Sequence, residues 1–506
     1  MVRKKYRFGK CLNRFRLRLA LGTAAGLMAL ALTACAGGNG ASDAITESAQ
    51  SASGETGVPK AGEGQNGSGA ESGSEAGASG SGVESGSQAG ASGSGAESGS
   101  EAGASGSGVD SGIGAGQPEA TVEPTPSAEE IYAEAVQLSL MHEGNYARLK
   151  AFIEKLRAGE KVTIAILGGS VTEGAGAGSN DKGYAYQFVE ELGKTYAVAP
   201  EEQLYYVIAG LSGTPSCLGL MRYQQDVIEP LGQAPDLLII EFAVNDWQEV
   251  TGGRAYESLV YEALKAKEDC AVISLCSVAR TAWNTQESFL TIAKHYQIPL
   301  VSLKKAVFTP LGDFRISSGL YFSDDYHPKF YGHKLMKDCL MNLFEKADAA
   351  PEGDPAPIPE EAVKGRDFTG MKQIDSRHQV KGLKAGSFGG TDEQVVTTFF
   401  TKAISFPNNF YHEAGAKNDP MKLSVKCKKI LVNYKTSTSK DFGEASFYLD
   451  GELVATLNGN GAGAWNNCNV ALLLDEDESA SHILEVKMAE GSEDKAFTIL
   501  SISYCE

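Results

Sequence analysis

The chain has 506 residues and a formal net charge of −19, with 42% hydrophobic and 22% charged residues. This length is sufficient for more than one domain, and the apolar content is that of a chain that builds hydrophobic cores. The acidic balance argues against nucleic acid and anionic membrane surfaces as partners held by charge.

The first 34 residues are predicted to be a secretory signal peptide. They contain eight basic and no acidic residues, and an apolar run from Leu19 ends in Leu32-Thr33-Ala34-Cys35. This ending resembles the lipobox of bacterial lipoproteins. The resemblance implies that Cys35 carries lipid and anchors the mature chain to the cell membrane, facing the extracytoplasmic side of a bacterium. The alternative is an ordinary signal peptide that contains a cysteine. Removing the eight basic residues changes the net charge from −19 to −27.

Residues 35–126 are predicted to be a disordered linker. They consist mainly of Gly, Ser, Ala and Glu, and the hexapeptide Gly-Ala-Ser-Gly-Ser-Gly begins at positions 77, 90 and 103. Such a composition cannot bury enough apolar surface to offset the entropy of ordering the chain. A flexible linker of about 90 residues has a root-mean-square reach of roughly 50 Å. We therefore expect a tether that carries the folded part through a cell-wall layer.

A folded region is predicted for residues 127–350. Ser127 and Glu130 form a capping-box pattern at the start of a helix, and Leu149, Phe152, Ile153 and Leu156 give a second helix one apolar face. Apolar runs that indicate strands lie at 164–167, 204–208, 237–242, 271–275 and 299–303, with helical patterns that include 184–192, 255–266 and 329–345. Strands separated by helices favour an α/β fold with a parallel sheet covered on both faces.

The composition changes after residue 350. Residues 351–364 form a linker rich in Pro and Glu, and from 365 to 506 short segments of alternating polarity predominate. Asp450-Gly451 lies between two such segments as a hairpin turn. We predict a C-terminal β-sandwich of jelly-roll-like type that serves either as a carbohydrate-binding module or as a structural cap. The extended, polar linker favours an independently folded unit.

The first strand of the folded region leads directly into Gly168-Gly169-Ser170, which would place the serine at the carboxyl end of a buried strand. Three common sites begin in this way. A phosphate-binding loop is excluded because Ala175-Gly176 stand where Lys and Ser or Thr are required. A dinucleotide fingerprint would need glycine at Ser179, and the nucleophile elbow of α/β-hydrolases would need glycine at Thr172. What remains is a serine that requires a base and an oxyanion site from elsewhere.

Loops after later strands contain suitable groups. Gly213 can offer a backbone N–H without a side chain in the way, and Asn245 can offer a side-chain amide. Asp324 stands three residues before His327. At this spacing a carboxylate can accept the Nδ1 proton, so that Nε2 is free to take a proton from a serine.

These residues resemble the four conserved blocks of the SGNH/GDSL hydrolases, in order, over about residues 128–347. The resemblance implies a flavodoxin-like three-layer α/β/α fold, with Ser170 as nucleophile, His327 as base and Asp324 as the acid that orients it. It also implies an oxyanion hole formed by Ser170, Gly213 and Asn245. The sequence departs from the family pattern in two places: Gly-Gly rather than Gly-Asp precedes the serine, and Ala243 replaces glycine two residues before the asparagine.

Several positions keep two interpretations. Asp325 is a rival to Asp324, although it is only two residues from His327. Trp247 either lines an acyl or sugar pocket or packs in the core, and Trp465 either stacks on a sugar ring or is a core aromatic residue. A metal site on Asp324 and His327 is disfavoured, since the sequence has no further histidine cluster or His-Glu-x-x-His run to complete a ligand set.

The sequence therefore predicts a surface-anchored esterase that removes small acyl groups, most simply acetyl, from a glycan, without cofactor or metal and without nucleic acid as a partner. A lipase or thioesterase acting on other small esters is the enzymatic alternative. A non-catalytic glycan-binding lipoprotein is the alternative from a different functional class.

Overall fold

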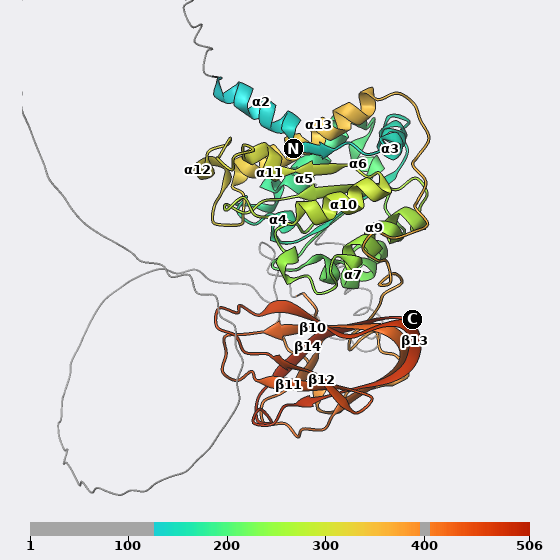
Figure 1. The fold of residues 1–506 in the computed structure, drawn as a ribbon, viewed down its shortest axis with the longest axis vertical. Coiled ribbons are helices and arrows are strands. Elements are labelled where there is room, and N and C mark those ends of the chain that lie inside the picture. Colours follow the sequence, from blue (N-terminus) through green and yellow to red (C-terminus); the bar gives the residue numbers. More distant parts are fainter. Residues whose placement is uncertain (1–125, 395–404) are drawn as a thin grey trace, which may run out of the picture. The chain divides into compact units, whose positions relative to one another are not determined.

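A computed structural model describes residues 126–394 and 405–506 (Figure 1). The predicted signal peptide, the lipid-bearing Cys35 and all but the last residue of the 35–126 linker lie outside the described residues. The described residues belong to one compact unit of the chain. Within them, no helix combines the length and the apolar character needed to cross a membrane.

The N-terminal part of the structure contains a six-stranded sheet in the order β1-β6-β5-β4-β2-β3. Its strands are β1 (Leu140–His142), β2 (Val162–Gly168), β3 (Leu204–Gly210), β4 (Leu237–Glu241), β5 (Ala271–Cys276) and β6 (Leu300–Ser302). The five strands predicted from the sequence are all present and run parallel, whereas the additional β1 pairs antiparallel with β6 at the edge. The α/β prediction is therefore confirmed.

Helices cover both faces of this sheet (Figure 1). The longer ones are α2 (Ala128–Leu138), α3 (Ala147–Arg157), α5 (Tyr184–Tyr196), α7 (Ser216–Tyr223), α9 (Arg254–Ala266), α10 (Gln286–Tyr296) and α13 (Phe330–Ala349). The shorter ones are α4 (Ser170–Glu173), α6 (Pro200–Gln203), α8 (Glu229–Leu231), α11 (Leu303–Val307) and α12 (Ser318–Tyr321), with 3₁₀ turns η1 (Asn180–Lys182) and η3 (Asp246–Gln248) and a π-helical turn η2 (Gln224–Ile228).

The alternation of side chains along β2 explains the two helical layers. Ile164 and Ile166 pack with α3, α5 and α13, whereas Ala165 and Leu167 pack with α7, α9 and α10 on the opposite face. Every residue of β2 is buried, as expected for a central strand of a parallel sheet. The predicted capping box of α2 is also present, because Ser127 and Glu130 exchange their hydrogen bonds.

The C-terminal part is all-β and antiparallel, which confirms the predicted fold class. Its strands are β7 (Lys372–Ile374), β8 (Leu383–Lys384), β9 (Phe410–His412), β10 (Met421–Thr436), β11 (Glu444–Leu449), β12 (Glu452–Asn458), β13 (Asn467–Met488) and β14 (Phe497–Cys505), and a 3₁₀ turn, η4, spans Gly386–Phe388. The main path of hydrogen-bonded strands is β12-β11-β13-β10-β14-β7. Asp450 and Gly451 join β11 to β12 with φ angles of 53° and 92°, as a two-residue hairpin turn of type I′ requires.

One face of this β-sheet shares a hydrophobic core with helices of the α/β part. Leu431 and Leu500 pack in the same cluster as residues of α7 and α9, whereas Ile430 and Val432 point into the core of the β-region itself. All nine residues of β14 are consequently buried. The C-terminal part is therefore packed against the α/β part through a shared core.

The 351–364 linker is also bound to the α/β part rather than free. Arg148 of α3 donates to the carbonyl of Ala356, and the Glu257 carboxylate of α9 accepts backbone N–H groups from Val363, Lys364 and Gly365. The backbone polar groups of the linker therefore find partners on α3 and α9.

Candidate active site

The predicted nucleophile lies on a tight turn at the end of β2. Gly169 is extended, and Ser170 begins the four-residue helix α4, which ends at Gly174 with a φ of 100°. A Cβ atom at Gly168 would lie 2.1 Å from the Thr172 hydroxyl oxygen, and one at Gly169 would lie 2.3 Å from Asn245 Oδ1. Both glycines are therefore required. The position where the family pattern has Asp lacks a side chain because Asn245 occupies that space.

Ser170, His327 and Asp324 form one line of hydrogen bonds. His327 Nε2 lies 2.9 Å from Ser170 Oγ, and His327 Nδ1 lies 2.8 Å from Asp324 Oδ2. The other carboxylate oxygen, Oδ1, accepts the backbone N–H groups of Tyr326 and His327, both at 2.9 Å. Burial opposes ionisation of Asp324, but these hydrogen bonds outweigh it and lower the pKa of this carboxyl group.

Asp325, the rival acid, lies apart from this line. Its side chain is 76% exposed and pairs with Arg280 at 3.6 Å. Arg280 follows β5, and its Nε and Nη2 atoms both donate to the carbonyl of Asp324, while its own N–H donates to the carbonyl of Asp325. Arg280 thus clamps the loop that carries the acid. The sequence contained no signal for this contact, since the two residues are 44 positions apart.

Hydrogen bonds connect the loops that carry Gly213 and Asn245, the two other predicted oxyanion donors. Asn245 is 8% exposed beside Gly169, and Gly213 adopts a φ of 69° in the loop after β3. The Asp246 carboxylate accepts both the backbone N–H and the hydroxyl of Ser216, each at 2.7 Å. This pair of bonds ties the loop after β4 to the loop after β3. Asp246 therefore stabilises its loop.

Comparison with known families identifies this region. A model of the GDSL-like Lipase/Acylhydrolase family matches residues 166–335, from within β2 into α13. This region is a GDSL-like hydrolase domain. The resemblance that the sequence motifs carried is therefore confirmed, and the domain is that of a serine ester hydrolase of the SGNH type.

The similarity to solved structures extends beyond the GDSL domain of this chain. The crystal structure of a two-domain esterase active on acetylated mannans matches with a TM-score of 0.64 and 25% identity, covering 73% of this chain and 99% of that one. A structure of such an esterase co-crystallised with mannopentaose matches with a TM-score of 0.62 and 26% identity, covering 73% and 98%. Curated protein sequences give no match.

The β-region contributes a residue beside the GDSL site. Trp465 is 51% exposed, and a Cβ atom at Gly213 would lie 3.0 Å from its ring atom Cζ2. The interpretation of Trp465 as a core aromatic residue is therefore wrong. Sequence reasoning had no means of pairing Trp465 with Gly213, because the contact depends on how the two sheets pack.

A fully buried carboxylate that the sequence did not indicate lies beneath the Ser170 turn. Glu241, the last residue of β4, accepts hydrogen bonds from the hydroxyls of Thr172 and Ser277, and the Thr172 hydroxyl also contacts Tyr184 OH at 2.8 Å. Burial raises the pKa of Glu241 to about 7, although the hydroxyl hydrogen bonds oppose the shift. This carboxyl group links α4, β4 and the loop after β5, all of which carry site residues.

Glu241→Gln should make stability less dependent on pH. The pKa of Glu241 is raised from 4.5 to about 7 on folding, so between these values the unfolded chain loses this proton and the folded protein keeps it. The free energy of unfolding of the parent should therefore fall, relative to that of Glu241→Gln, by up to about 3 kcal/mol as the pH rises through this window. Urea unfolding from pH 4.5 to 8 measures this difference, with the exposed Glu360→Gln as control. Parallel pH curves for the parent and Glu241→Gln would contradict the assignment.

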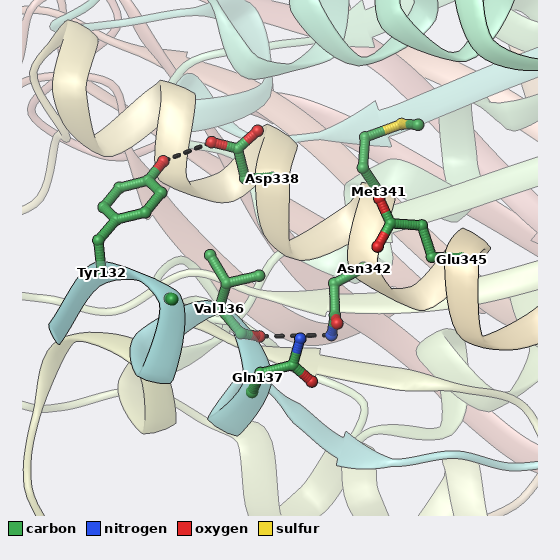
Figure 2. Close-up of a pocket in the computed structure, with 8 residues that line it drawn as sticks. Tyr132, Val136, Gln137, Asp338, Met341, Asn342 and Glu345 are labelled. Carbon is green, nitrogen blue, oxygen red and sulfur yellow. Dashed lines mark hydrogen bonds between the residues drawn. The ribbon is translucent and has the colours of Figure 1, made fainter. Parts of the chain in front are cut away.

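Elsewhere, the described residues form a hollow between two helices but no metal site. Among the described residues, no group of three or more His, Cys, Asp or Glu side chains could hold a metal ion. A hollow of about 260 Å³ between α2 and α13 is lined by Tyr132, Asp338 and Asn342, among others. Figure 2 shows Tyr132 bonded to Asp338 and Asn342 bonded to the carbonyl of Val136 across this hollow. None of the predicted site residues lines it.

Proposed function

We propose that this chain is a cell-surface esterase that removes small acyl groups, chiefly acetyl, from a glycan. The observation that carries the proposal is the hydrogen-bonded line from Asp324 through His327 to Ser170 at the end of β2 in a GDSL domain. The glycan is suggested by the match to an esterase active on acetylated mannans, which extends over almost the whole length of that protein. Trp465 beside Gly213 also supports it, because an exposed indole at the site suits a sugar ring better than an acetyl group.

The geometry supports a mechanism with an acyl-enzyme. Ser170 Oγ attacks the ester carbonyl while His327 Nε2 takes its proton, and Asp324 holds the imidazole so that Nδ1 keeps its hydrogen. His327 then returns the proton to the departing sugar oxygen. A water molecule, deprotonated by His327, releases the acid and restores the serine.

The oxyanion of each tetrahedral intermediate would be held by the backbone N–H groups of Ser170 and Gly213 and by the side-chain amide of Asn245. Fixed donors of this kind typically contribute a factor of about 10²–10³ to turnover each. The two hydrogen bonds that Ser216 donates to the Asp246 carboxylate support this role, because they fix the loops of Gly213 and Asn245 relative to each other.

The location is part of the proposal. The lipobox-like ending at Cys35 and the polar 35–126 linker would hold the catalytic domain on a flexible lipid tether outside the cell membrane. Incorporation of labelled palmitate that is lost in Cys35→Ala would support this placement. Secretion of unlabelled protein would contradict it.

The preference of the protein for the acyl group and for the alcohol of the ester tests the proposed function. The protein should hydrolyse 4-nitrophenyl acetate faster than the butyrate and octanoate esters, and it should release acetate from acetylated mannooligosaccharides. Higher kcat/KM on octanoate would favour the lipase, and higher kcat/KM on acyl-thioesters would favour the thioesterase. No hydrolysis of any ester, combined with retained binding of oligosaccharides, would mean that the chain is a binding protein.

A further inference from the structure

The three tryptophans of the chain are all exposed, although this residue is usually well buried. Trp247 is 65%, Trp283 39% and Trp465 51% exposed. Trp247 lies in η3, two residues after Asn245, and Trp283 lies in the loop between β5 and α10. Both loops follow strands whose carboxyl ends lie at the same sheet edge as Ser170, and neither ring has a part in the proposed chemistry.

Hydrogen bonds hold the loop of Trp283 between the loop that carries Asp324 and His327 and the loop that carries Asn245. The carbonyl of Trp283 accepts the N–H of Ala279, and Ala282 within this turn adopts a φ of 61°. At one end of the loop, Arg280 binds the backbone of the acid loop. At the other end, the N–H and hydroxyl of Thr285 both donate to the carbonyl of Ala243, two residues before Asn245. The backbone of Trp283 is therefore fixed next to both His327 and Asn245 loops.

The loop of Trp247 is fixed as firmly. Its neighbour Asp246 is bonded to Ser216, and the Glu249 carboxylate accepts the backbone N–H groups of Thr251 and Gly253. A loop held in this way presents its indole with little loss of freedom on binding a ligand. Preorganised aromatic residues of this kind contribute strongly to binding.

We propose that Trp247 and Trp283 bind pyranose rings of the glycan chain next to the acylated sugar. This proposal rests on the proposed function and specifies its substrate as an acylated sugar within an oligosaccharide or polymer. A pyranose offers a face of C–H groups that packs against a flat indole, whereas a small ester needs no such surface. The sugars should carry no negative charge, because the side chains of Asp324 and Asp325 are exposed here and Arg280 is already bound to both residues.

The test compares Trp247→Ala and Trp283→Ala with the parent on acetylated mannooligosaccharides of two to six residues and on 4-nitrophenyl acetate. Each substitution should raise KM for the hexasaccharide about tenfold, change kcat by less than threefold and have a smaller effect on the disaccharide. The Phe variants should recover part of the loss. Tyr205→Ala serves as control, because this exposed aromatic residue lies near the opposite end of β3. Titration of Ser170→Ala carrying each substitution with the hexasaccharide should show the same loss of affinity.

The outcomes separate this inference from the proposed function. If the parent releases acetate from the hexasaccharide and both Trp→Ala variants keep KM within twofold, the inference is overturned and the proposed function stands. If the variants lose activity on 4-nitrophenyl acetate as strongly as on the hexasaccharide, the rings are structural and the inference is again overturned. If the parent hydrolyses aryl acetate but no acetylated glycan, both proposals fail.

Discussion

Ser170→Ala should lower ester hydrolysis by about 10³-fold or more while leaving the fold intact, because no other group can form the acyl-enzyme. Turnover of 4-nitrophenyl acetate and of acetylated oligosaccharides measures the loss. A fluorophosphonate probe should label the parent and fail to label the variant.

The fold should survive because the Ser170 side chain has a functional rather than a structural partner. Its hydroxyl contacts His327, whereas the helix α4 that it begins is held by backbone bonds and by the Thr172 hydroxyl on Glu241. Ser179→Ala is the matched control, since that hydroxyl donates to Asp181 in an exposed turn. Activity of Ser170→Ala within tenfold of the parent, at an unchanged melting temperature, would mean that the nucleophile lies elsewhere.

The parts of the site that the sequence predicted are those encoded by local patterns. Residues 164–167 of β2 are a continuous apolar run, and the two glycines that follow them mark a turn whose need for glycine the contacts of Gly168 and Gly169 explain. Asp324 and His327 are three residues apart, so their hydrogen bond forms within one turn of chain. The topology of parallel strands then brings Ser170 and Asn245 to the same edge of the sheet.

The parts that the sequence did not predict depend on contacts between distant segments. Nothing in the sequence near Glu241 indicates that Thr172 and Ser277 will meet it in the core. A three-residue strand such as β1 is too short to show a periodic pattern and is defined only by its partner β6. The contacts of the 351–364 linker were not predicted for a related reason. Proline and glutamate indicate an extended chain but do not reveal which surface will bind its backbone.

Truncation after residue 350 should have the second large effect, because it should leave a GDSL domain that does not fold stably. Removal of 351–506 exposes the face of α7 and α9 against which Phe368, Leu431 and Leu500 are buried. Burial of each such side chain stabilises by about 1.5–3 kcal/mol, and the free energy of unfolding of a whole domain is roughly 5–15 kcal/mol. The truncated chain should therefore be insoluble or show no cooperative melting.

A network of ion pairs between α9 and the C-terminal part also makes the GDSL domain depend on residues 351–506 for its stability. Arg254 of α9 pairs with Asp367 and with Asp475 of β13, and Lys429, whose side chain is 1% exposed, pairs with the same two carboxylates. Hydrogen bonds from Arg254, followed by those from Lys429, lower the pKa of Asp475 to about 2. Truncation removes the two acids and leaves Arg254 without either partner.

Two truncated chains, one ending at 350 and one at 366, distinguish the contribution of the linker to stability from that of the β-sheet. A chain ending at 366 keeps the three N–H groups that bind Glu257 but still lacks the sheet, so it should fail like the chain ending at 350. Soluble yield, circular dichroism and hydrolysis of 4-nitrophenyl acetate measure the outcome, with residues 126–506 as the folded reference. If the chain ending at 350 melts cooperatively and hydrolyses the aryl ester like the reference, the shared core is dispensable. The β-region would then act only by placing Trp465 beside Gly213, and its loss would reduce activity on the glycan alone.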